Sequence, residues 1–161
     1  MTCSGLLSLV YALGALQIIA EPTLQERADF TQCIDTQDEE SCFDLIVNSC
    51  VPTLDTETHE GVLACAQREL TLWEELVEAR YEALLEVVEG AEEAQSDEDG
   101  GDPRDELRAS QSFWESLRDS DCAHMASAYR VETLSRLTAL ECFRLQSAER
   151  AIWLGTQLTK G

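Results

Sequence analysis

Six cysteines that follow the first twenty residues constrain the fold of this chain more than any other feature. They are Cys33, Cys42, Cys50, Cys65, Cys122 and Cys142, whereas the seventh, Cys3, lies in an apolar N-terminal segment. An even set of cysteines in a short exported chain is typical of a disulfide framework. In a cytosolic enzyme the same residues would more often be metal ligands or nucleophiles. The role of the cysteines therefore depends on the compartment in which the protein resides.

The N-terminal segment predicts export. Its sequence, MTCSGLLSLVYALGALQIIA, has no charged side chain, and the apolar run over residues 6–20 has the length of a signal-peptide core. A membrane span is usually longer and has basic flanks. We therefore expect residues 1–20 to be a cleaved signal peptide, and residues 21–161 to form a single domain that is periplasmic or secreted, with no membrane attachment. An uncleaved N-terminal anchor is the alternative, because no Lys or Arg precedes the apolar core.

The charge of the chain limits its partners. It has 32 Asp and Glu residues against 11 Lys and Arg, which gives a formal net charge of −21. Nucleic acids and anionic lipid surfaces would repel such a protein. A basic protein would be attracted, and its association would be fast and sensitive to salt. We expect a partner of that kind, although the charge could also serve solubility alone.

The apolar residues predict an all-α fold, because they recur at spacings of three and four and no long stretch alternates with period two. One stripe predicts a helix over residues 60–89 and consists of Ala66, Leu70, Trp73, Val77, Tyr81, Leu84 and Val88. We expect its glutamates to cover the exposed surface; they are Glu69, Glu74, Glu75, Glu78, Glu82 and Glu86. A second stripe, after Pro103, consists of Leu107, Trp114, Leu117, Met125 and Ala128.

A third long helix is expected from Leu134 to the C-terminus, and two short helices over residues 22–34 and 41–50. The sequence thus predicts a disulfide-linked bundle of about five helices, two short and three long. Residues 90–103 include six carboxylates and three glycines, which favours a mobile acidic linker. A calcium-binding loop is the alternative, but the ligand pattern of an EF-hand is not met.

The pairing of the cysteines is open at this stage, because six cysteines allow 15 connectivities. If residues 41–50 form one helix, Cys42 and Cys50 lie about 12 Å apart along its axis, too far for a disulfide. We favour pairs across successive connections between helices: Cys33–Cys42, Cys50–Cys65 and Cys122–Cys142. A zinc site is the competing use, but CxxC pairs are absent and His59 and His124 are not at ligand spacing. We expect no cofactor and no metal.

Arg118 has two interpretations. On a helix it shares a face with Trp114, Leu117, Asp121 and Cys122. The first interpretation is a half-buried guanidinium that stacks near Trp114 and pairs with a carboxylate of a neighbouring helix, because buried arginines are rare unless paired. Direct contact with a partner is the second.

A loop closed by Cys50 and Cys65 would lose little entropy on binding and would suit insertion into the cleft of a partner. Its candidate contact residues are Asp55, Glu57, His59 and Glu60, which could equally be ordinary surface residues. No GxSxG, HExxH, P-loop or GxGxxG motif occurs, so we expect that the protein is not an enzyme.

Several motifs resemble a known family. They are Cys65-Ala-Gln-Arg-Glu69, Trp73, Tyr81, Leu107-Arg-Ala-Ser-Gln111, Trp114, Arg118-Asp119, Cys122, Cys142, Arg150 and Leu154. Over about residues 42–154 the chain resembles the LprI N-terminal domain family of lysozyme inhibitors, which are exported bacterial proteins. The family motif maps to Gln111, Trp114, Arg118, Asp119, Cys122, Cys142 and Arg150. The resemblance implies an all-helical periplasmic or surface-exposed module in which the late cysteine pair is bridged.

The resemblance also implies inhibition of a basic lysozyme-type muramidase. The hypothesis is that the acidic helix and the Cys50–Cys65 loop occlude the cleft of the enzyme. The alternative is a cell-envelope interaction protein that has another protein partner and no inhibitory activity.

Overall fold

The computed structural model describes residues 20–54, 58–92 and 102–160. The helices are α1 (Leu24–Thr36), η1 (Glu39–Cys42), α2 (Leu45–Cys50), η2 (Val51–Thr53), α3 (His59–Glu92), α4 (Pro103–Ser127) and α5 (Glu132–Leu158), where η denotes a 3₁₀ turn. No strand occurs among the described residues, and the predicted all-α fold with two short and three long helices is confirmed. The predicted signal peptide and most of the predicted acidic linker lie outside the described residues.

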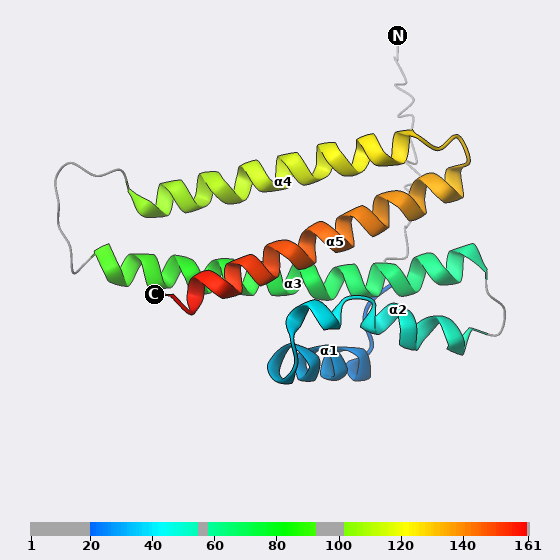
Figure 1. Cartoon of the computed structure of the whole chain (residues 1–161), viewed down its shortest axis with the longest axis horizontal. Helices are drawn as coiled ribbons and strands as arrows, with labels where there is room; N and C mark the ends of the chain where they lie inside the picture. The colour runs from blue at the N-terminus through cyan, green and yellow to red at the C-terminus, as the bar shows by residue number, and fades with distance from the viewer. Residues whose placement is uncertain (1–19, 55–57, 93–101, 161) are drawn as a thin grey trace, which may run out of the picture.

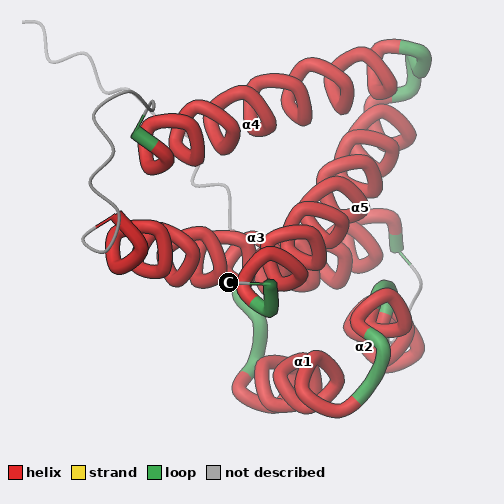
Figure 2. Tube along the Cα trace, turned by 60° about the vertical axis from the view of Figure 1, so that its left-hand side comes forward, coloured by secondary structure: helices red, strands yellow, loops and turns green. Residues whose placement is uncertain are grey.

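The long helix α5 holds the other helices together. It runs diagonally between α4 and α3 and makes the most extensive contacts with both, whereas α4 touches α3 much less (Figure 1). The short helices α1 and α2 lie on the side of α3 away from α4 (Figures 1 and 2). Two of the long helices are thus packed on α5, and the N-terminal elements pack on another side of α3.

The core lies along α3. Trp73 is fully buried there and meets the Phe30 ring of α1 edge-on, with 4.8 Å between the ring centroids. The same cluster includes Ile46 from α2, Leu107 from α4 and Leu154 from α5. A smaller cluster near the start of α3 contains Leu63, Ala66, Leu70 and Leu140. The predicted stripe of α3 therefore faces the core through both clusters.

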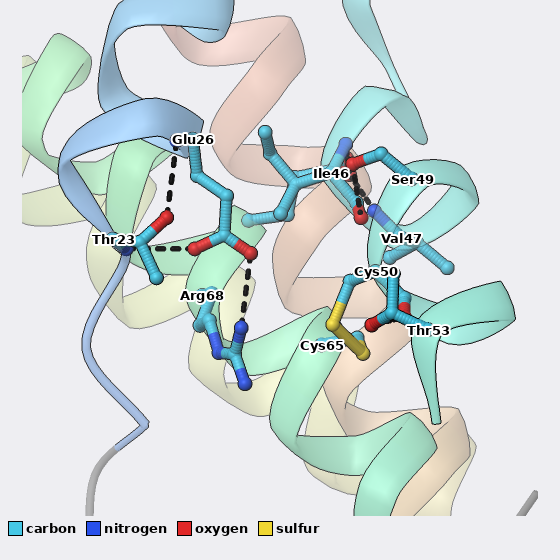
Figure 3. Close-up of polar contacts among 10 residues, drawn as sticks. Thr23, Glu26, Ile46, Val47, Ser49, Cys50, Thr53, Cys65 and Arg68 are labelled. Carbon is cyan, nitrogen blue, oxygen red and sulfur yellow. Dashed lines mark hydrogen bonds and ion pairs between the residues drawn. A yellow bond between two sulfur atoms is a disulfide. The ribbon is translucent and has the colours of Figure 1, made fainter. Parts of the chain in front are cut away.

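Side-chain caps define where two of the helices begin. Thr23 and Glu26 form a capping box at the start of α1, and Glu26 also accepts a hydrogen bond from Arg68 Nη1 of α3 at 3.0 Å (Figure 3). Burial alone would raise the pKa of Glu26, but the hydrogen bonds from Thr23 and Arg68 outweigh it and the pKa is lowered. At α4, the Asp102 carboxylate caps the helix and Pro103 occupies its first turn.

Three disulfides link successive elements, and they are the pairs that the spacing favours. They join Cys33 to Cys42, Cys50 to Cys65 and Cys122 to Cys142, with Cα–Cα distances of 5.9, 5.7 and 5.4 Å. They link α1 to η1, α2 to α3 across η2, and α4 to α5, and each such bridge typically contributes about 2–4 kcal/mol.

The single helix expected over residues 41–50 is wrong, because the chain turns at Asp44. The 3₁₀ turn η1 ends at Cys42 and α2 begins at Leu45, while Asp44 adopts a left-handed conformation with φ of 65°. The distance argument against a Cys42–Cys50 pair therefore used the wrong geometry. Aspartate tolerates the left-handed region better than most residues, and its N–H donates to Glu69 in this conformation.

Two expectations about helix faces are also wrong. Glu69 was expected on the surface of α3, but it is fully buried. On α4, Leu117 and Met125 were expected in the apolar stripe, but they are 58% and 49% exposed, and Asp121 and Ala128 are exposed as well. Because α4 packs mainly on α5, only a narrow side of it is covered.

Candidate partner-binding surfaces

A disulfide and local hydrogen bonds hold the two ends of the connection between α2 and α3. The Cys50–Cys65 disulfide ties the end of α2 to the second turn of α3 (Figure 3). Thr53 Oγ1 of η2 donates a hydrogen bond to the Cys50 carbonyl at 2.7 Å, and Thr58 Oγ1 accepts one from the Gly61 N–H at the start of α3. The described ends of this connection, residues 51–54 and Thr58, are therefore each tied to the neighbouring helix end.

Two of the four candidate contact residues lie together at the start of α3. His59 and Glu60 are both exposed, and Glu60 pairs with Arg136 of α5 at 3.1 Å. Since both side chains of this pair are largely exposed, it contributes little to stability. Asp55 and Glu57 lie outside the described residues.

A row of carboxylates covers the C-terminal half of α3. Glu78, Glu82 and Glu86 recur every four residues, so they share one helix face, and all three are exposed. Within the part of the chain that the structure describes, none of the three makes a hydrogen bond or an ion pair. We call these three residues the acidic ridge. At 1.5 Å per residue, the ridge begins about 27 Å along α3 from Glu60.

The fully buried Glu69 belongs to the other half of α3 and has many partners. Its carboxylate accepts hydrogen bonds from the backbone N–H groups of Asp44, Ile46 and Val47 at 2.8, 3.0 and 3.1 Å. These are free N–H groups at the start of α2, which a carboxylate satisfies well. Glu69 thereby fixes the position of α2, and with it Cys50 and the closed connection.

Arg144 of α5 supplies the positive charge beside Glu69. It is 2% exposed, lies 3.4 Å from Glu69 and also pairs with Asp44 and Glu141. Sequence reasoning missed both partners of this buried pair. The signal for Glu69 was its register, because it lies three residues after Ala66 and four before Trp73, on the apolar stripe. No comparable signal singles out Arg144.

The family motif forms the contact between α4 and α5. Arg150 of α5 donates from Nε and Nη2 to Gln111 Oε1 at 3.1 and 3.0 Å, and its guanidinium lies over the ring of Trp114 at 5.5 Å. Burial lowers the pKa of Arg150, although a nearby carboxylate, Glu115, opposes this. Together with the Cys122–Cys142 disulfide, these residues hold α4 on α5.

Arg118 joins α4 to both neighbouring helices, as the first interpretation of the sequence expected. Its guanidinium lies 4.8 Å from the Trp114 ring and 5.3 Å from the Phe143 ring, and it pairs with Glu74 of α3 at 3.4 Å. It also pairs with Asp119 at 3.0 Å. Burial raises the pKa of Glu74 and the charge of Asp119 adds to this, while Arg118 opposes it. The side chain is thus engaged within the molecule.

Across residues 20–54, 58–92 and 102–160, no group of three or more His, Cys, Asp or Glu side chains is arranged to hold a metal ion. In the same ranges, no helix combines the length and the apolar character that crossing a membrane requires.

The fold defines a disulfide-linked helical domain, and three disulfides are typical of proteins in oxidising compartments. The chain belongs to the lysozyme inhibitor LprI family, whose model matches residues 50–154. The match includes the Cys50–Cys65 and Cys122–Cys142 pairs and the α4–α5 motif, and it begins after α1 and η1. Neither a curated protein nor a solved structure matches this chain.

Proposed function

We propose that this protein is an exported inhibitor of a basic lysozyme-type muramidase and acts by occluding the enzyme's cleft. Membership of the lysozyme inhibitor LprI family is the observation that carries the proposal. The exposed carboxylates of the acidic ridge support a basic partner, and the three disulfides support a location outside the cytosol.

The mechanism assigns different roles to two surfaces. Glycoside hydrolases act through two carboxyl groups that flank the scissile bond, so a protein segment in the cleft blocks access of the glycan. The closed segment with Asp55, Glu57, His59 and Glu60 is the inserting element, because its anchors reduce the entropy lost on binding. The acidic ridge steers the basic enzyme toward the inhibitor.

The separation of these surfaces makes the two roles measurable. The ridge begins about 27 Å from Glu60, so its charges act mainly on the encounter and the loop acts on the bound complex. Substitutions in the ridge should lower the association rate and its dependence on salt. Substitutions in the loop should raise the dissociation rate.

The decisive experiment measures lysozyme turnover of a cell-wall substrate with the oxidised protein in excess at low salt. We expect turnover to fall to a small residual rate. Two triple variants, Asp55→Asn/Glu57→Gln/Glu60→Gln in the loop and Glu78→Gln/Glu82→Gln/Glu86→Gln in the ridge, each remove three carboxylates. They are therefore matched in net charge, and binding kinetics should separate their effects. Unchanged turnover with the unsubstituted protein in excess rejects the proposal.

A second candidate function is that of a cell-envelope interaction protein with another protein partner. It is favoured by the apolar residues that α4 exposes, since Phe113, Leu117 and Met125 are 76%, 58% and 49% exposed. A pull-down from a periplasmic extract separates the two functions. Recovery of a partner other than a muramidase, lost on Phe113→Ser/Leu117→Ser substitution, favours the second candidate.

A further inference from the structure

A pocket of about 590 Å³ lies between α5 and the segment that runs from η1 to Phe43. Its volume is within the range of ligand-binding pockets, roughly 300–1,000 Å³. It is lined by Glu40, Phe43, Leu145, Ala148, Glu149, Ile152, Trp153 and Thr156. None of these residues belongs to the loop or to the acidic ridge, and Glu40 and Phe43 precede the part of the chain that the family model matches.

The pocket has an apolar surface that is open to solvent. Ala148 is buried and Ile152 is half-buried, whereas Leu145 and Trp153 are 47% and 43% exposed. The α5 residues recur at spacings of three and four, so one face of the helix forms this wall. Exposed apolar side chains beside a concavity are typical of a surface that binds an apolar group.

Internal contacts hold the two walls of the pocket in place. Arg80 of α3 donates to both carboxylate oxygens of Glu39 in η1 at 2.7 Å each, and to the Ala151 carbonyl of α5 at 2.8 Å. The guanidinium lies against Gly155, where an added Cβ would be 2.6 Å from Arg80 Nη1. The Cys33–Cys42 disulfide anchors η1 to α1. The pocket is therefore preformed, which reduces the entropic cost of binding.

The charges at the pocket determine what kind of group it accepts. The carboxylates of Glu40 and Glu149 make no hydrogen bond or ion pair within the described ranges of the chain, so an apolar ligand alone would partly desolvate them without compensation. The aromatic rings of Phe43 and Trp153 already contact arginines of the protein itself. Arg144 lies 4.7 Å from the Phe43 ring and Arg150 lies 4.6 Å from the Trp153 ring. A cation on the ligand is therefore drawn to the carboxylates, one on each wall.

We propose that this pocket binds an apolar side chain of a protein partner that is flanked on both sides by lysine or arginine. The apolar side chain packs on Leu145, Ile152 and Trp153, and the flanking cations pair with Glu40 and Glu149. This second docking site does not depend on the lysozyme proposal, which assigns inhibition to the loop and the ridge.

The test is an NMR titration of the oxidised protein, which is expressed from the full chain and labelled with ¹⁵N. Three tripeptides with blocked termini serve as ligands at low salt. Lys-Leu-Lys carries the proposed chemistry, Lys-Ser-Lys lacks the apolar group, and Glu-Leu-Glu reverses the charge. We expect Lys-Leu-Lys to shift the indole N–H resonance of Trp153 in a saturable way and to leave that of the buried Trp73 unchanged. The other two peptides should bind about tenfold more weakly, because each loses one part of the interaction.

Variants show whether the pocket itself is responsible. Glu40→Gln/Glu149→Gln should weaken Lys-Leu-Lys binding about threefold, whereas Glu82→Gln/Glu86→Gln, which changes the net charge equally, should leave it nearly unchanged. Leu145→Ser should weaken it as well, and Leu24→Ser, at an 87% exposed residue of α1, should not. The proposal is overturned if Lys-Ser-Lys binds as tightly as Lys-Leu-Lys, or if the two double variants behave alike.

Discussion

The two halves of α3 use the same residue type in opposite ways. In the N-terminal half, Glu69 is fully buried and accepts hydrogen bonds from three backbone N–H groups beside Arg144. In the C-terminal half, the three glutamates of the acidic ridge are exposed and unpaired among the described residues. The first half is packed against α1, α2 and α5.

This difference shows that the role of a glutamate depends on what the rest of the chain places beside it. A buried carboxylate is tolerated only where donors and an opposite charge compensate the loss of water. The start of α2 and Arg144 provide both at Glu69. Among the described residues the ridge has no such partners, so its charges contribute to the electrostatic field that attracts a basic protein.

The largest expected effect is that of Glu69→Gln. The amide removes the negative charge, leaves Arg144 with only the more exposed carboxylates of Asp44 and Glu141, and places an NH₂ group among N–H donors, so we expect the free energy of unfolding to fall by about 3–5 kcal/mol. Urea denaturation measures the change. The matched control Glu78→Gln, on the ridge, should lie within about 0.5 kcal/mol of the unsubstituted protein. Equal effects of the two variants would contradict the contrast between the two halves.

The next largest effect is expected from removal of the Cys50–Cys65 disulfide, which links the N-terminal half of α3 to α2. The double variant Cys50→Ser/Cys65→Ser opens a loop with a sequence separation of 15 residues, and we expect a loss of about 3 kcal/mol. Denaturation under oxidising conditions measures the loss. The unsubstituted protein, fully reduced, serves as the reference for removal of all three bridges, and the double variant should be more stable than that reference.

A smaller, pH-dependent effect is expected at Glu26, which joins α1 to Arg68 of α3. Its pKa is lowered in the folded protein, so its carboxylate stabilises the fold above its ordinary pKa of 4.5, and this contribution is lost as the pH falls through the lowered value. Glu26→Gln should therefore cost about 1 kcal/mol at pH 7 and progressively less below pH 4.5. Denaturation of both proteins between pH 3 and pH 7 gives the difference. A difference that is independent of pH would show that charge is not the cause.

The smallest effect on stability is expected from the ridge. The triple variant Glu78→Gln/Glu82→Gln/Glu86→Gln removes like charges that repel each other at spacings of four residues, so the free energy of unfolding should rise by a few tenths of a kcal/mol, about 0.5 at most. The increase should vanish at 1 M salt, where the Debye length is about 3 Å. A marked loss of stability would mean that the ridge has an internal partner after all.

Much of the architecture could be predicted because it depends on local patterns. The stripe of Trp73 and Val77 indicated α3, Pro103 marked the start of α4, and the even number of cysteines, placed on either side of connections between helices, indicated disulfide pairs across those connections. The turn at Asp44 could not be predicted in this way, since its conformation depends on a hydrogen bond to Glu69, which lies 25 residues away. The prediction for Leu117 and Met125 was wrong for a related reason. Periodicity shows that a helix face is apolar, but not whether another helix covers that face.

The candidate surfaces also differ in whether local sequence patterns could predict them. His59 and Glu60 were proposed as contact residues from the position of a loop between cysteines, and the packing of Arg118 was predicted from its spacing to Trp114; both signals are local. The pocket beside Trp153 was not foreseen, because its walls, Glu40 on η1 and Glu149 on α5, are more than a hundred positions apart in the chain. Tertiary contacts bring them together, among them those of Arg80 with Glu39 and with the Ala151 carbonyl.

The sequence by itself determined the helical class of this protein, its disulfide framework, its acidity and its family, because each depends on residue type and on short-range spacing. The tertiary structure decided which charges are buried and which are free. Burial of Glu69 beside Arg144, exposure of the ridge and formation of the pocket all depend on contacts between residues distant in the chain. The physical reason is that the energy of a charge is set by its surroundings, and those surroundings exist only once the helices have packed.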